Sequence, residues 1–179
     1  MMILIVIVSI LAVAYLDGAS AQTLQAEEME MKNLTVDLGF VRVPDEHTCA
    51  GRDISPRIEV KGLDAASMAI ILDDPDAPRG VFTHWIIWNI PPTEVIPQGV
   101  PRDGTVTGPI QAVQGRNSFG KIGHFGPCPP PGKPHRYFFR IYGLDRMLDL
   151  KAGASRVDLE RAMAGHVLQQ GEAIATYGR

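Results

Sequence analysis

The sequence predicts a mainly β domain with a single α-helix near its C-terminus, on the basis of three observations. Gly (18 residues) and Pro (14) together make up close to a fifth of the 179 residues, which favours short strands joined by turns over a bundle of long helices. Several separate segments are rich in β-branched and aromatic residues, as strands are. Apolar residues recur at helical spacing only after Ser155.

Strands are expected in five segments. Leu34, Val36 and Leu38 alternate with polar neighbours, as in a half-buried strand. The other four expected strands are residues 57–61, 68–73, 83–90 and about 135–144. Long loops are expected at residues 44–56 and 91–134. The second loop is crowded with Pro and Gly and is too long for an idle connection in a compact domain, so we expect it to carry function.

Alternation assigns the side chains of two expected strands to faces. In residues 83–90, one face should hold His84, Ile86, Trp88 and Ile90, and the other Trp85, Ile87 and Asn89. In residues 135–144, one face should hold His135, Tyr137, Phe139 and Ile141, and the other Arg136, Arg140 and Tyr142. His135 and Tyr137 are therefore expected to point in the same direction.

The last expected element is the helix. Ser155 stands three residues before Asp158, which resembles a capping box at a helix start. Leu159, Met163 and Val167 then recur at helical spacing as far as Gly171. This pattern predicts one amphipathic helix packed on the β body.

The N-terminus has the pattern of an export signal. Residues 3–16 are almost all apolar, and the small residues of Ala19-Ser20-Ala21 stand before Gln22, so we expect a signal peptide at residues 1–21. The apolar run is shorter than the roughly 20 residues that cross a bilayer, although an uncleaved anchor is the alternative. Residues 22–32 are expected to form a polar leader and residues 33–179 a single domain. The sequence thus predicts a periplasmic or secreted protein without a stable transmembrane anchor after cleavage.

Export bears on the two cysteines, Cys49 and Cys128, because an oxidising compartment permits a disulfide bond. Two separate buried thiols are the alternative, and the sequence leaves both open.

The charge balance excludes one class of partner. With 17 basic and 20 acidic side chains the net charge is -3, so a nucleic-acid partner is not expected.

An acidic corner is the first candidate for a binding site. Residues 73–78 read Asp-Asp-Pro-Asp-Ala-Pro, and His84 follows closely. Each proline fixes its own backbone and restricts the preceding residue, so Asp74 and Asp76 are held on a stiff turn. A solvated turn whose carboxylates cap their own backbone is the alternative.

A Gly-Pro loop is the second candidate. Residues 126–132 read Gly-Pro-Cys-Pro-Pro-Pro-Gly, and His135 and Tyr137 follow. We expect the backbone at Gly126 to approach a ligand closely. Two imidazoles, a phenol and a carboxylate beside this loop would offer several donors to a phosphate, sulfate or carboxylate group. An ordinary turn with a strand-end histidine is the alternative.

Taken together and in order, these motifs resemble the phosphatidylethanolamine-binding protein family, in its bacterial and archaeal branch called Raf-kinase-inhibitor-like. The resemblance rests on DDPDAP, on HW followed by NIP, on GPCPPPGKPHRY, and on shorter matches at residues 48–51, 55–56 and 165–167. It covers most of residues 37–179. The chain departs from the branch at His124-Phe125, where a tyrosine is usual, which alters the expected pocket rim.

The resemblance implies an antiparallel β-sandwich-like body with a C-terminal helix and a small anion pocket for phosphate-like groups, including phospholipid headgroups. The ligand-binding residues that it implies are Asp74, Asp76, His84, Gly126, Pro127, Cys128, His135 and Tyr137. No metal or other cofactor is expected. The sequence therefore predicts an exported, non-enzymatic binding protein that inhibits or regulates a partner such as a protease or kinase. The alternative is a metal-dependent hydrolase with Asp74, Asp76, His84 and His135 as ligands.

Overall fold

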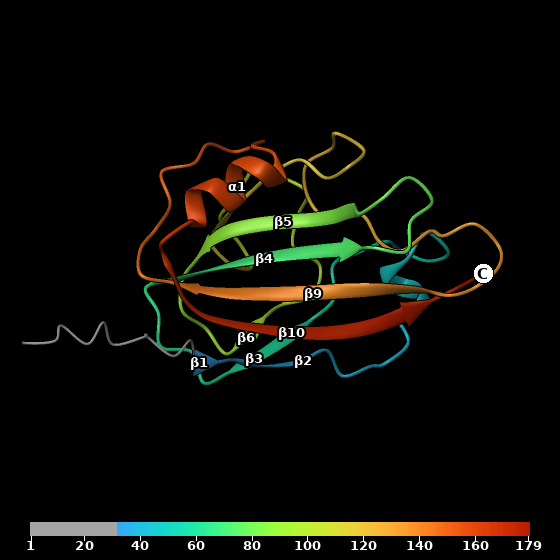
Figure 1. The fold of residues 1–179 in the computed structure, drawn as a ribbon, viewed down its shortest axis with the longest axis horizontal. Helices are drawn as coiled ribbons and strands as arrows, with labels where there is room; N and C mark the ends of the chain where they lie inside the picture. Colours follow the sequence, from blue (N-terminus) through green and yellow to red (C-terminus); the bar gives the residue numbers. More distant parts are fainter. Residues whose placement is uncertain (1–31) are drawn as a thin grey trace, which may run out of the picture. The chain divides into compact units, whose positions relative to one another are not determined.

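The computed structural model describes residues 32–179, which form a mainly β unit (Figure 1). The predicted signal peptide, and the predicted leader except Lys32, lie outside the described residues. In the described part of the chain a seven-stranded sheet has the order β1-β10-β9-β4-β5-β8-β7, and a second sheet has the order β2-β3-β6. All strand pairs are antiparallel except β1 with β10.

The elements have the following bounds in chain order. They are β1 Lys32–Asn33, β2 Thr35–Asp37, the 3-10 helix Asp45–His47, β3 Ile58–Lys61, β4 Ser67–Asp74, β5 Phe82–Ile90, β6 Val95–Ile96, β7 Thr105–Val106, β8 Ala112–Gln114, β9 His135–Leu144, α1 Arg156–Met163 and β10 Val167–Tyr177. Each of the five predicted strands has a counterpart. No helix among residues 32–179 is long and apolar enough to cross a membrane.

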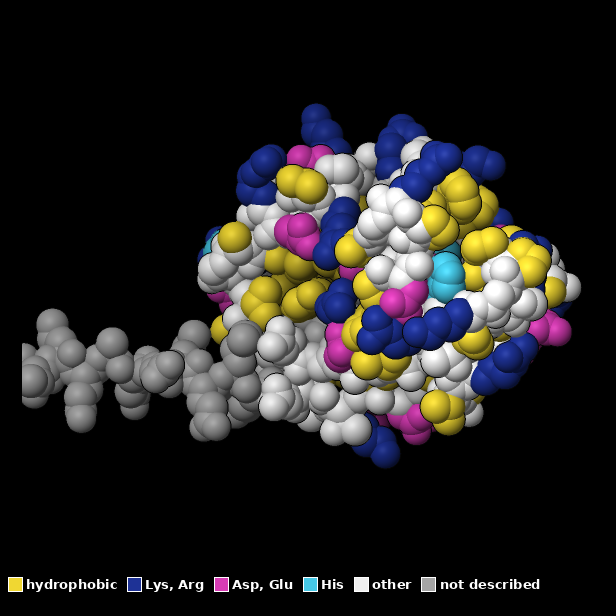
Figure 2. All heavy atoms as spheres, turned by 45° about the vertical axis from the view of Figure 1, so that its right-hand side comes forward, with side chains coloured by type: hydrophobic (Ala, Val, Ile, Leu, Met, Phe, Trp, Pro, Cys, Tyr) yellow, Lys and Arg dark blue, Asp and Glu magenta, His cyan; other side chains and the backbone are white. Residues whose placement is uncertain are grey.

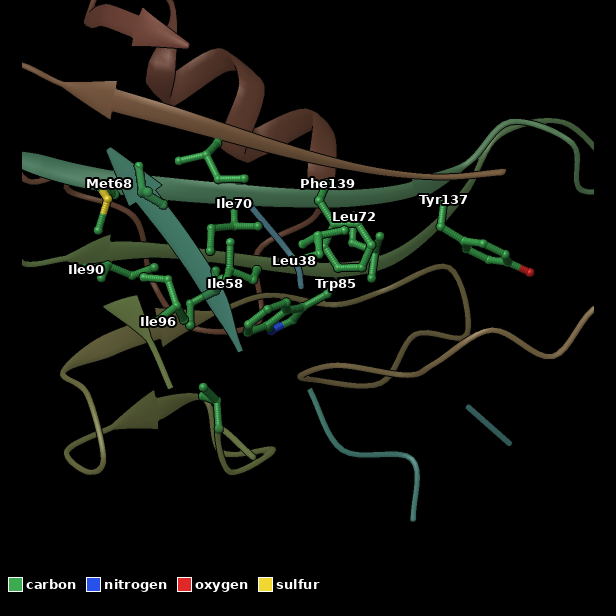
Figure 3. Packing of buried hydrophobic residues seen from close by; sticks show 14 of the residues in the cluster. Leu38, Ile58, Met68, Ile70, Leu72, Trp85, Ile90, Ile96, Tyr137 and Phe139 are labelled. Carbon is green, nitrogen blue, oxygen red and sulfur yellow. The ribbon is translucent and has the colours of Figure 1, made fainter. Parts of the chain in front are cut away.

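Two apolar layers hold these elements together. The first lies between the sheets and includes Met68, Ile70 and Leu72 of β4, Trp85 of β5, Phe139 of β9, Ile58 of β3 and Ile96 of β6 (Figure 3). The second lies on the other face of the large sheet, where Ile71, Ile86 and Trp88 pack against Leu159 and Met163 of α1. Burying each such side chain stabilises the fold by roughly 1.5 to 3 kcal/mol. The predicted β-sandwich-like body with its helix is confirmed.

The predicted helix begins correctly but ends too late. Ser155 forms the expected capping box with Asp158, and α1 stops at Met163. Gly165 follows with a φ of 79°, a left-handed conformation that ends helices. The segment from Val167 onward is the long strand β10 and not helix. At Gly171 an added Cβ would lie 2.6 Å from the Leu34 carbonyl oxygen, so this strand needs a glycine there.

Strand β5 breaks the predicted alternation twice. Leu72 pairs with Trp85 but Asp73 pairs with Thr83, so His84 is an extra residue in β5. This bulge turns His84 to the face of Trp85, where its ring lies 5.3 Å from that of Tyr137. A second irregularity adjoins Asn89, which has a φ of 56°.

The second irregularity explains the position of Ile90, which packs between the sheets with Ile87 instead of sharing the face of Trp88. The predicted face of β5 was therefore wrong at both ends. In β9 the prediction was right, because Tyr137, Phe139 and Ile141 all pack between the sheets and Tyr142 lies on the other side.

Candidate functional site

A cavity of about 130 Å³ lies where the C-terminal end of β4 meets the N-terminal ends of β5 and β9. These strand ends are on the right-hand side of Figure 1. Five of the eight predicted site residues line it, namely Asp74, His84, Gly126, Cys128 and His135. Segments that are far apart in the sequence thus supply the two imidazoles, a carboxylate and the Gly-Pro loop to one small space. A larger groove of about 440 Å³ crosses β9 and β10, but no histidine lines it.

Asp74 and His135 form the charged part of the cavity. Asp74 is 4% exposed, and its Oδ2 accepts a hydrogen bond from Nδ1 of His135 at 2.8 Å. Its Oδ1 accepts the backbone N–H of Asp76 at 2.8 Å, which closes the proline turn. Because the carboxylate accepts from Nδ1, the remaining nitrogen Nε2 of His135 accepts a hydrogen bond in the neutral ring and donates one only after protonation.

His84 has the same arrangement with a different partner. Its Nδ1 donates to the carbonyl oxygen of Phe125 at 2.6 Å, and a carbonyl can only accept. The ring is 5% exposed, and this burial lowers the pKa of His84 below its ordinary value. The bulge in β5 is thus what brings a neutral imidazole, with Nε2 left for a ligand, to the cavity.

Tyr137 stands behind His84 and does not belong to the cavity lining. Its side chain is fully buried, and its hydroxyl has no hydrogen-bond partner among the described residues. Burial raises the pKa of the phenol, so it remains a donor at all ordinary pH values. Figure 3 shows the hydroxyl oxygen at the outer end of the core, pointing away from it. An unpaired buried hydroxyl is costly, and such groups are often functional.

A disulfide bond between Cys49 and Cys128 joins the early loop to the Gly-Pro loop, with the two Cα atoms 5.4 Å apart. The Cys49 N–H also donates to the Pro127 carbonyl oxygen at 3.1 Å. Pro127 itself does not line the cavity. The wall that contains Cys128 is therefore tied to the scaffold by a covalent bond and by backbone contacts.

Gly126 also meets a requirement that the sequence analysis did not name, and its approach to a ligand stays a prediction. An added Cβ would lie 1.9 Å from the His47 carbonyl oxygen, so the close approach is to the chain's own backbone. The Gly126 N–H donates to Oδ1 of Asp53 at 2.6 Å. Asp53 has a φ of 57° and also accepts from Arg102 at 2.6 Å. Nothing in the sequence pattern singled out Asp53 as the support of this loop.

Asp76 does not join the cavity. Arg136 holds its carboxylate through Nε at 2.9 Å, Nη2 at 2.8 Å and the backbone N–H at 2.9 Å. These contacts hold the pKa of Asp76 well below its usual range. The residue lines a neighbouring depression of about 310 Å³ together with residues 130–135.

The alternative metal site does not form. Of its four proposed ligands, Asp76 is paired with Arg136, and both oxygens of Asp74 already accept hydrogen bonds. Within residues 32–179 no group of three or more His, Cys, Asp and Glu side chains is arranged to hold a metal ion. The predicted ligand set therefore does not converge as metal coordination requires.

The ligand-binding residues named from the sequence did not include the apolar part of the lining, although both predicted segments contribute to it. Ala77, Pro78, Phe82, Phe119, Pro129 and Pro130 complete the cavity wall. Phe119 gave a weak signal as an aromatic residue in a polar loop between Ser118 and Gly120. The histidine beside Phe125 has no part in the lining: His124 is 2% exposed, and burial lowers its pKa to about 3.

The fold and the cavity define a β-sandwich protein with a small ligand pocket at its strand ends. The family model described as phosphatidylethanolamine-binding protein matches residues 37–178, and the chain belongs to this family. The resemblance identified in the sequence is confirmed.

Relatives come from archaea and bacteria. A UPF0098 protein of Pyrococcus horikoshii is 51% identical over 156 residues, which cover 86% of this chain and 79% of that protein. A solved phosphatidylethanolamine-binding protein homologue of Chlamydia trachomatis superposes with a TM-score of 0.72 at 33% identity, covering 82% of this chain and 97% of its own. YbcL of Escherichia coli, described as a new member of the mammalian PEBP family, gives 0.73 at 29% identity, covering 82% and 98%.

Proposed function

We propose that this protein is an exported, non-enzymatic binding protein whose cavity holds a small phosphate-like group, such as a phospholipid headgroup. One observation carries the proposal. The Nδ1 atoms of His84 and His135 are both held by groups that only accept hydrogen bonds, the Phe125 carbonyl and the Asp74 carboxylate. Each Nε2 therefore becomes a donor when the ring takes up a proton, and an arriving anion favours that proton uptake.

The dimensions of the cavity support the same class of ligand. A volume of about 130 Å³ is well below the roughly 300 to 1,000 Å³ of typical drug-sized sites, so only a headgroup-sized part of a lipid fits. Proline and phenylalanine side chains form much of the apolar wall. Hydrogen bonds to a charged group are stronger in such surroundings.

Two observations support export. The N-terminal segment has the pattern of a signal peptide. The disulfide bond between Cys49 and Cys128 suits an oxidising compartment, since cytosolic proteins of mesophiles rarely keep such bonds. Regulation of a protease or kinase, which family membership suggests, remains a prediction.

Calorimetry with phosphorylethanolamine, a headgroup without acyl chains, tests the proposal. We expect measurable binding by the wild-type protein at pH 6 and at least about a tenfold loss in His84→Gln, since one charge-assisted hydrogen bond contributes roughly 1.5 to 3 kcal/mol. His166→Gln is the matched control, because His166 pairs with Asp145 and lies outside the cavity. Absence of binding by folded wild-type protein would exclude the proposed function.

A further inference from the structure

The tripeptide Asn33-Leu34-Thr35 has the pattern Asn-X-Ser/Thr, which is the acceptor sequence for N-linked glycans in exported proteins. The chain contains three asparagines, and only Asn33 has a hydroxyl residue two positions later. After Asn89 and Asn117 that position holds a proline and a phenylalanine. The sequence therefore offers one acceptor, and it lies within the described residues.

The backbone presents the two side chains that an acceptor sequence needs. Asn33 is the last residue of β1 and Thr35 is the first of β2, so both lie in extended chain. Leu34 between them is 6% exposed and packs in the core, whereas Asn33 and Thr35 are both exposed, as alternation requires. In the described part of the chain β1 is also the outermost strand of its sheet. The acceptor is therefore open to an enzyme.

The side-chain amide of Asn33 has no hydrogen-bond partner among the described residues, unlike the other two asparagines. Asn89 donates to the Leu148 carbonyl oxygen at 2.9 Å and accepts from the Leu148 N–H at 2.7 Å. Asn117 is buried and donates to the Gly123 carbonyl oxygen at 3.3 Å. A glycan is bulky, so its acceptor must face solvent and hold no structural contact. Asn33 meets both conditions.

Asn33 also lines the groove of about 440 Å³ that crosses β9 and β10 on the sheet face that carries α1. Figure 2 shows basic, acidic and hydrophobic side chains interspersed on this side of the molecule. The volume lies within the roughly 300 to 1,000 Å³ of typical small-molecule sites. The other lining residues are Leu34, Arg140, Tyr142, Gln170, Gly171 and Glu172.

The chemistry of this lining suits sugars. Sugar hydroxyls both donate and accept hydrogen bonds, and the groove offers a guanidinium, a carboxylate, an amide and a phenol. Arg140 is held by Asp73 at 2.9 Å and by Glu172 at 2.8 Å, so its donors have fixed positions. The ring of Tyr142 adds an apolar surface beside them. The groove and the acceptor sequence thus point independently to the same place.

We propose that Asn33 carries an N-linked glycan and that the first sugars of this glycan lie in the groove across β9 and β10. Nδ2 of Asn33 attacks the anomeric carbon of an oligosaccharide carried on a lipid phosphate, loses a proton and forms the new C–N bond. The bond from that carbon to the phosphate oxygen breaks, and the lipid phosphate leaves. A membrane-bound glycosyltransferase of the exporting cell supplies this donor. The inference rests on the export that the proposed function includes.

Mass spectrometry of the protein purified from the organism that encodes it tests the modification. The wild-type chain should exceed the mass of its sequence by whole sugar residues, and peptide fragmentation should place the addition on Asn33. Asn33→Gln and Thr35→Ala should each lose the whole addition. Thr35→Ser is the matched control, because it keeps a hydroxyl two positions after Asn33 and should keep the addition.

Hydrogen exchange on the same samples tests the place of the sugars. Deuterium uptake by residues 169–172 of β10 should be several-fold slower in the glycosylated wild type than in Thr35→Ala, because docked sugars cover this segment. Uptake by α1, which does not line the groove, should be equal in the two proteins. A glycan on Asn33 without this protection overturns the docking in the groove and supports the modification alone.

The remaining outcomes separate this inference from the proposed function. Unmodified Asn33 in protein recovered outside the cytosol overturns the inference alone. Recovery from the cytosol, with Asn33 unmodified, overturns export as well. Phosphorylethanolamine calorimetry is independent of both, because Asn33 and Thr35 do not line the cavity, so Thr35→Ala should bind as the wild type does. Absence of binding in both proteins, with a glycan present, overturns the anion pocket and supports the modification.

Discussion

Asp73 and Asp74 are consecutive residues at the end of β4, and both are almost fully buried, at 1% and 4% exposed. They nevertheless face opposite sides of the large sheet. Asp73 accepts hydrogen bonds from Thr83 at 2.8 Å, Arg140 at 2.9 Å and Arg156 at 3.2 Å. Asp74 instead accepts from His135 inside the cavity.

The difference lies in what the partners can do. An arginine keeps its charge at every ordinary pH, so Asp73 is in a permanent ion-pair network that fastens α1 to the sheet through Arg156. Burial raises the pKa of Asp73, and the hydroxyl and the two guanidinium groups oppose that rise. A histidine can gain or lose a proton, so Asp74 belongs to a site whose charge responds to a ligand. Burial alone does not distinguish a structural carboxylate from a functional one.

The largest expected effect is on the structural side of the comparison. Asp73→Asn removes a buried charge from two arginines, which should lower the free energy of unfolding by roughly 2 to 3 kcal/mol. This figure lies below the usual cost of breaking a buried pair, because Arg140 and Arg156 are about a third exposed and each keeps a glutamate partner. Urea denaturation measures the loss. Phosphorylethanolamine affinity should stay within about twofold of the wild type. A greater loss of affinity in the folded variant would show that the two faces of the sheet are coupled.

Asp74→Asn should give the opposite pattern. Asparagine can still accept the Asp76 N–H and keep the turn, so stability should fall by less than about 1 kcal/mol. Without the carboxylate the imidazolium of His135 loses its charged partner, and phosphorylethanolamine affinity should fall about tenfold. Melting temperature and calorimetry on one sample measure both effects. If neither changes, Asp74 serves only to cap the turn.

The third prediction concerns pH. Burial lowers the pKa of His84 in the ligand-free protein, and a bound anion must raise it. Affinity is therefore greatest below the ligand-free pKa and falls as pH rises toward the pKa of the complex. Calorimetry from pH 6.5 to pH 8, where a phosphate monoester is mostly dianionic because its second pKa is about 6, should show weakening in the wild type and a flatter profile in His84→Gln. An affinity that increases with pH would contradict protonation on binding.

The smallest expected effect concerns Tyr137. Tyr137→Phe removes a buried hydroxyl without a partner, so the unfolding free energy should rise by about 0.5 to 1 kcal/mol. Affinity for phosphorylethanolamine should fall a few-fold in the same variant if the hydroxyl donates a hydrogen bond to the bound phosphate from its position beside His84. Denaturation measures the change in unfolding free energy, and calorimetry measures the change in affinity. A variant that is less stable would mean that the hydroxyl has a structural partner.

Much of this site could be predicted from the sequence, because the two candidate segments and the alternation of side chains in β9 are local patterns. His135 and Tyr137 share a face as predicted. His84 was correctly chosen for the site but assigned to the wrong face, since a bulge depends on pairing with β4 and leaves no mark in β5 alone. The strand β10 was missed because Gly171, Ala173 and Ala175 have low β propensity, and Met163 and Val167 happen to match a helical period.

Long-range partners explain the remaining differences. Asp76 was predicted to bind the ligand, but its carboxylate pairs with Arg136, which is 60 residues away in sequence. The disulfide between Cys49 and Cys128 was one of two open alternatives, because pairing depends on a geometry that only the folded chain shows. Phe119 reaches the cavity from a loop whose path no local pattern predicts.

The most direct test of the central claim is to count the protons that bind with the ligand. Titrating the wild-type protein with phosphorylethanolamine near pH 7, in buffers of different ionisation enthalpy, gives the net proton uptake from the change in observed heat. The account predicts uptake at the His84 and His135 pair, reduced in His84→Gln and unchanged in His166→Gln. Binding with no uptake, or with proton release, would contradict the claim that this pocket holds an anion by charging its imidazoles.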